Sequence, residues 1–106
     1  MNSKASTELQ AQDLEQDIKD LLNQANPNPQ DLVASMLLAF EMAHALSQIG
    51  AMSHGRRIAV NGLIASLMKL HLELANRLTA ILQNLMLSQP IPSTQLPGGG
   101  ASVFKP

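Results

Sequence analysis

The 106-residue sequence contains no cysteine, no tryptophan and no tyrosine. Without cysteine there is no disulfide framework, no thiolate metal ligand and no cysteine nucleophile. The two aromatic residues, Phe40 and Phe104, cannot fill a core, so Leu, Ile, Met and Ala must do so. This composition favours helices over sheets, because strands prefer aromatic and β-branched side chains. We therefore predict an all-α protein with a single core.

Charge of either sign is also scarce, since seven basic and eight acidic residues give a net charge of −1. Nucleic-acid binding requires several cations that neutralise phosphates, and only Arg56 and Arg57 are adjacent. We therefore predict no direct contact with nucleic acid. The segment up to Gln12 is polar and has no apolar signal sequence, which indicates a cytoplasmic protein.

No residue pattern in the chain carries catalysis. The serines lack a G-x-S-x-G pattern, and no strand is predicted that would present a nucleophile. A two-helix metal site can be drawn from Glu41, His44, His71 and Glu73, but such sites need more carboxylates than these helices supply. We predict a protein that is not an enzyme and has no catalytic residue, no metal and no cofactor.

Breaks in the hydrophobic pattern predict one helical domain at residues 7–87, with disordered segments at 1–6 and 88–106. A modest amphipathic helix is expected at 7–25. Asn28 is a good N-cap and Pro29 suits the first helical position, so a second helix should run over 29–49 and end before Gly50. The third helix should span 56–87. The short connection predicts an antiparallel hairpin of the second and third helices, with a short N-terminal helix that caps it or awaits a partner.

Two apolar stripes run along the third helix. The first stripe has steps of three and four residues in an eleven-residue repeat, which predicts a nearly straight packing surface. It consists of Leu63, Leu67, Leu70, Leu74, Leu78, Ile81 and Leu85. The second stripe lies beside it and consists of Ile64, Met68, Leu72, Ala75, Leu82 and Met86. Lys69, Glu73 and Arg77 are predicted to mark an exposed polar face.

A hairpin has one internal interface, which is too little to cover both stripes. Leaving the second stripe in water would forfeit on the order of 5 to 10 kcal/mol, comparable to the stability of a whole domain. We therefore predict a homodimer in which two hairpins form a helical bundle. The residues assigned to the dimer interface are Leu63, Leu67, Leu70, Leu74, Leu78 and Ile81, and those assigned to another protein partner are Met36, Phe40, Met68 and Leu72.

The start of the second helix, Asn28-Pro29-Gln30-Asp31-Leu32, the alanine-rich helix that follows and the long helix after it resemble the quorum-sensing antiactivators of the TraM-like class. The resemblance covers residues 29–87. It implies a protein that sequesters a LuxR-type quorum-sensing transcription factor, of the LasR kind, and blocks its dimerisation and DNA binding. The family supplies no catalytic residue, and the interface residues above come from the apolar pattern alone.

Two other functions fit the same helical pattern. A small structural or assembly component of a phage or a secretion system would also have a helical hairpin, but it would form rings or larger oligomers. A membrane-active protein is the third possibility. Several ionisable residues in the long helices argue against a membrane span, since each costs roughly 2.5 to 3.5 kcal/mol at the bilayer centre.

Overall fold

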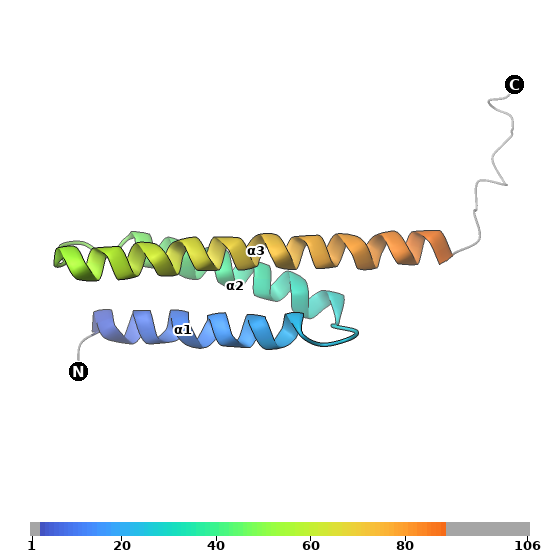
Figure 1. The fold of residues 1–106 in the computed structure, drawn as a ribbon, viewed down its shortest axis with the longest axis horizontal. Coiled ribbons are helices and arrows are strands. Elements are labelled where there is room, and N and C mark those ends of the chain that lie inside the picture. Colours follow the sequence, from blue (N-terminus) through green and yellow to red (C-terminus); the bar gives the residue numbers. More distant parts are fainter. Residues whose placement is uncertain (1–2, 89–106) are drawn as a thin grey trace, which may run out of the picture.

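Three α-helices make up the described part of the chain, residues 3–88 of a computed structural model. They are α1 (Ser3–Leu22), α2 (Pro29–Ser47) and α3 (His54–Ser88). Figure 1 shows α1 and α3 running in the same direction and α2 running in the opposite direction. Each helix contacts the other two, most extensively α2 with α3. No strand occurs within residues 3–88, so the predicted all-α class is confirmed.

The start of α2 follows the predicted cap. The Oδ1 atom of Asn28 accepts a hydrogen bond of 2.8 Å from the Gln30 N–H, and Pro29 occupies the first helical position. At the other end, the Gln48 N–H donates to the carbonyls of His44 and Ala45, so α2 ends at Ser47, two residues before the predicted end at residue 49. The exposed residue Gly50 follows in the loop.

The long helix α3 begins at His54, two residues before the predicted start, because Ser53 caps it. The Ser53 hydroxyl accepts a hydrogen bond of 3.2 Å from the Arg56 N–H. The helix then continues through Gly62 without a break. It ends at Ser88, one residue past its predicted end. At 1.5 Å per residue it is about 50 Å long, whereas α1 and α2 are about 30 Å long.

The first helix, with 20 residues, has nearly the predicted length but is shifted toward the N-terminus. It begins at Ser3, four residues before the predicted start, since Lys4 and Ala5 are good helix formers. The first two residues and the predicted tail beyond Ser88 lie outside the described part of the chain.

The C-terminal end of α1 is fixed by an arginine from α3. Arg77 donates from its Nη atoms to the carbonyls of Leu22, Gln24 and Ala25, at 3.2, 3.1 and 2.9 Å. These acceptors lie in the last turn of α1 and the residues after it, where carbonyls have no partner within the helix. The helix ends at Leu22, three residues before the predicted end, and Arg77 is not part of a purely exposed polar face.

A second arginine joins the opposite end of α1 to α3. The Nε atom of Arg56 donates to Glu8 Oε1 at 2.8 Å, and its Nη2 atom pairs with the same oxygen. Both side chains are about one-fifth exposed. Arg56 therefore joins the start of α3 to the N-terminal half of α1.

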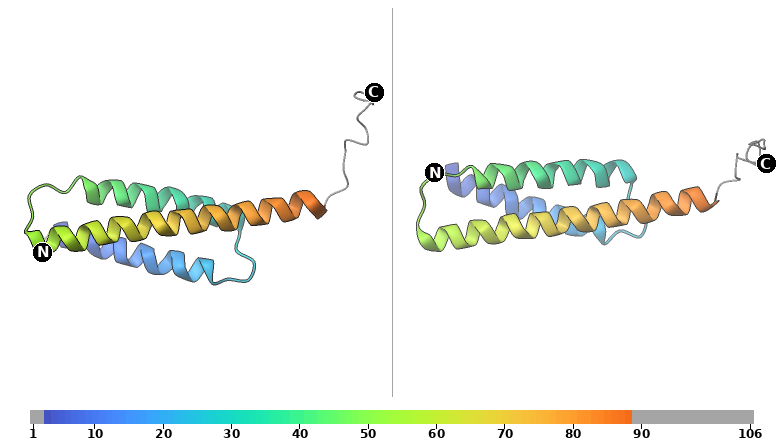
Figure 2. Two further views of the ribbon diagram at one scale, coloured as in Figure 1. Left: turned by 45° about the horizontal axis from the view of Figure 1, so that its top comes forward. Right: turned by 90° about the horizontal axis from the view of Figure 1, so that it is seen from above.

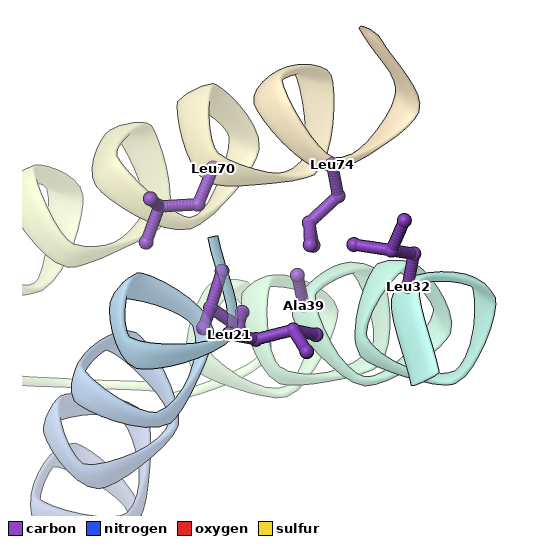
Figure 3. Packing of buried hydrophobic residues seen from close by; sticks show 6 residues of the cluster. Leu21, Leu32, Ala39, Leu70 and Leu74 are labelled. Carbon is purple, nitrogen blue, oxygen red and sulfur yellow. The ribbon is translucent and has the colours of Figure 1, made fainter. Parts of the chain in front are cut away.

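The interior is wholly apolar and comes from all three helices. One cluster is built around Ile18, Leu21, Leu32, Ala39, Leu70 and Leu74, and Figure 3 shows several of these side chains pointing toward one another. The second cluster is built around Ala11, Ala43, Leu46, Val60 and Leu67. No polar side chain is buried within residues 7–88. Packing alone therefore holds the centre of the fold, and the arginine contacts lie at its edges.

We predict that Leu74→Ala lowers the free energy of unfolding by about 2 to 5 kcal/mol, because Leu74 is fully buried and truncation leaves a cavity. Urea denaturation followed by circular dichroism measures the change. The matched control is Leu72→Ala in the same turn, where the side chain is 60% exposed and the expected change is within about 0.5 kcal/mol. Equal costs for the two variants would contradict this placement of α3.

We also predict that Arg77→Ala lowers the free energy of unfolding by about 1 to 3 kcal/mol, since it removes three charge-assisted hydrogen bonds. Arg77→Lys should recover only part of this, because one ammonium group cannot replace a forked donor. Amide hydrogen exchange at Asn23 and Gln24, whose N–H groups bond back to α1, should accelerate in Arg77→Ala. Unchanged exchange at these two amides would show that Arg77 does not fix the end of α1.

Candidate protein-binding face

Three of the six residues that the sequence assigned to a dimer interface lie inside the chain, and the other three lie at the edge of its core. Leu67, Leu70 and Leu74 are buried. Leu63, Leu78 and Ile81 are partly buried against the same two clusters. This assignment is corrected because α1, treated in the sequence as a cap or a free segment, is a second internal neighbour of α3. Most of the first stripe is therefore core.

Three of the four residues assigned to a protein partner lie on the surface. Phe40 is 56% exposed, Leu72 is 60% exposed and Met68 is 38% exposed. The fourth residue, Met36, is half-buried and packs against the Ile18-containing cluster. Met36 therefore contributes mainly to the core, whereas the other three residues remain available for contact with another molecule.

An apolar groove lies between α2 and α3, the two helices that carry these residues. It has a volume of about 480 Å³ and is lined on one side by the first turns of α2, including Val33 and Leu37, and on the other by Leu78 and Leu82. Phe40 follows Leu37 by about one turn on α2, and Leu72 precedes Leu78 by less than two turns on α3.

The groove and the exposed partner residues therefore follow one side of the α2–α3 pair. We call this surface the α2–α3 face, and it consists of Val33, Leu37, Phe40, Met68, Leu72 and Leu82. All six side chains are more than one-third exposed. An apolar surface of this extent is typical of an interaction site, because soluble monomers seldom leave large contiguous apolar patches in water.

A second exposed apolar region lies at the end of α3. Figures 1 and 2 show that this end extends past both α1 and α2. Leu85, Met86 and Leu87 are 49%, 75% and 84% exposed. We call residues 82–88 the overhang. The sequence indicated that the end of α3 is apolar, since the first stripe continues to Leu85. It did not indicate where α2 stops covering α3.

The two histidines considered for metal binding lie on different helices, His44 on α2 and His71 on α3. His44 and His54 are exposed, and His71 is half-buried on α3. Within residues 3–88, no three His, Asp or Glu side chains are grouped closely enough to hold a metal ion.

Within the described residues, α3 is long enough and apolar enough to cross a membrane. Core helices of soluble proteins also meet these two conditions. In this structure, Leu67 and Leu74 on its first stripe pack against α1 and α2. The second stripe is more exposed, and it is the part of α3 that needs a functional explanation.

Comparisons of the chain with protein-family models, with curated proteins and with solved structures found no match. The resemblance to quorum-sensing antiactivators therefore stays a prediction from the sequence.

Proposed function

We propose that this protein is a non-enzymatic antiactivator that binds a LuxR-type transcription factor through its α2–α3 face. Binding would keep the transcription factor from forming the dimer that contacts DNA. The partner class comes from the sequence resemblance, and the choice of face comes from the structure. The observation on which the proposal depends is the exposure of Phe40 on α2 and of Met68 and Leu72 on α3, the helix that α2 contacts most extensively.

Phe40 is not needed to complete the core. The described core consists of aliphatic side chains, and Phe40 lies outside both of its clusters. An exposed aromatic ring with a neighbouring methionine is typical of protein interfaces, where aromatic residues and Met are enriched and Lys and Glu are depleted. Met68 adds a flexible side chain that can adapt its shape to a partner.

The mechanism that fits this surface is competition for apolar helical contacts. A helical protein with an exposed groove and adjoining apolar side chains can cover the apolar helix of another protein. Electrostatic attraction would contribute little, because the chain carries a net charge of only −1. Such a protein acts by occupying a surface and requires neither a cofactor nor a reaction.

The test is inhibition of DNA binding by a purified LasR-like regulator loaded with its signal molecule. We expect the wild-type chain to form a complex with the regulator in gel filtration and to abolish its binding to labelled operator DNA. The double variant Phe40→Glu with Leu72→Glu should weaken the complex by about 100-fold, since it places two charges in an apolar contact. Both residues are exposed, so the fold should persist.

The matched control is Leu9→Glu, which places the same charge at an exposed leucine of α1, away from the α2–α3 face. It should inhibit as strongly as the wild type. Failure of the wild-type chain to bind the regulator would contradict the proposed partner, and full inhibition by the double variant would contradict the proposed face. Assembly of the wild type into particles of more than four copies would favour a structural component instead.

A further inference from the structure

The overhang of α3 has the residue pattern of a core helix but lacks neighbours. Leu78 and Ile81 pack against the internal cluster, and Leu85 follows them at the same helical spacing. Leu85 is nevertheless half exposed, because α1 ends at Leu22 and α2 begins at Pro29, so neither helix extends along α3 as far as Leu85. The first stripe therefore continues for about one turn beyond Ile81, its last covered residue.

We propose that a second copy of this chain covers the overhang, in a two-fold dimer whose α3 helices pack antiparallel near Leu82. In this arrangement, Leu85 and Met86 of each copy enter the groove that Val33, Leu37 and Leu78 line on the other copy. The dimer would fill the groove and so compete with the transcription factor for Val33, Leu37 and Leu82, whereas Phe40, Met68 and Leu72 would stay exposed. The mass of the purified chain tests the dimer without the transcription factor.

The first argument for this occupant is geometric. The groove and the overhang are adjacent on one chain and share Leu82, which lines the groove and begins the overhang. A two-fold interface brings the same patch of both copies together, so it needs a projecting element and a complementary recess side by side. This chain has both.

The second argument is chemical. Residues 78–88 contain no charged side chain, so two copies can approach here without like-charge repulsion. The groove is lined by apolar residues apart from Gln30, which matches the Leu and Met side chains of the overhang. A charged partner would find no complementary charge on residues 78–88.

The third argument is the area available. The exposed parts of Val33, Leu37, Leu82, Leu85 and Met86 amount to roughly 500 Å² of apolar surface on each copy. Two copies would therefore bury about 1,000 Å², which lies at the lower limit of specific interfaces. This area predicts a dimer that forms at micromolar concentrations and dissociates on dilution.

Light scattering coupled to gel filtration tests the proposal on the full chain. At about 100 µM, a concentration well above a micromolar dissociation constant, the wild type should have twice the chain mass of 11.4 kDa. The double variant Leu85→Glu with Met86→Glu should have the mass of one chain and an unchanged helical circular dichroism spectrum. The control Leu72→Glu should remain a dimer. A monomeric wild type, as expected if residues 89–106 of the same chain cover the overhang, or a dimeric double variant, would overturn the proposal.

A cross-link at the two-fold axis provides a second test, because the chain contains no cysteine. The Leu82→Cys variant should form a disulfide-linked dimer on mild oxidation, visible on a non-reducing gel. The control Leu9→Cys, at an exposed residue of α1, should remain a single chain. Absence of the cross-link in Leu82→Cys, or equal cross-linking in both variants, would rule out an axis at Leu82.

Discussion

The fold depends on the burial of the first stripe of α3 between α1 and α2. Leu67 and Leu74 are fully buried, and each lies in a cluster to which all three helices contribute. Burial of such a side chain contributes about 1.5 to 3 kcal/mol, and no buried polar side chain within residues 7–88 offsets this gain. Removing α1 would uncover the same leucines, so the first helix is part of the core and not an appendage.

Once the first stripe is used internally, the remaining apolar surface explains the rest of the molecule. Most of the second stripe cannot face inward, because side chains about 100° further around a helix point to a different side, and within it Ile64 still packs against the Ala11-containing cluster. Met68 and Leu72 therefore remain exposed beside Phe40, and the overhang remains exposed because α2 is about 20 Å shorter than α3. The α2–α3 face is exposed because α3 carries two apolar stripes and only one is covered, and the overhang is exposed because α3 is longer than α2.

Local features of the fold could be predicted from the sequence, and contacts between distant residues could not. The start of α2 was predictable because the Asn28 cap and Pro29 act within one turn. Phe40 and Leu72 are exposed, and their assignment to a partner surface stays a prediction. The sequence did not predict that α1 covers the first stripe, because helical spacing identifies the apolar side of a helix but not the element that packs on it. Arg77 was missed because its acceptors lie more than 50 residues away.

The two arginine contacts give this apolar core a defined alignment. Leucine side chains pack against one another in several registers with similar energy, so they tolerate replacement by side chains of similar volume. Arg56 on Glu8 and Arg77 on the carbonyls after α1 pin α1 at both ends, about one helix length apart. Sequence drift in a protein of this kind should therefore be free among its buried aliphatic residues and restricted at two positions on its periphery, where lysine lacks the planar fork of donors.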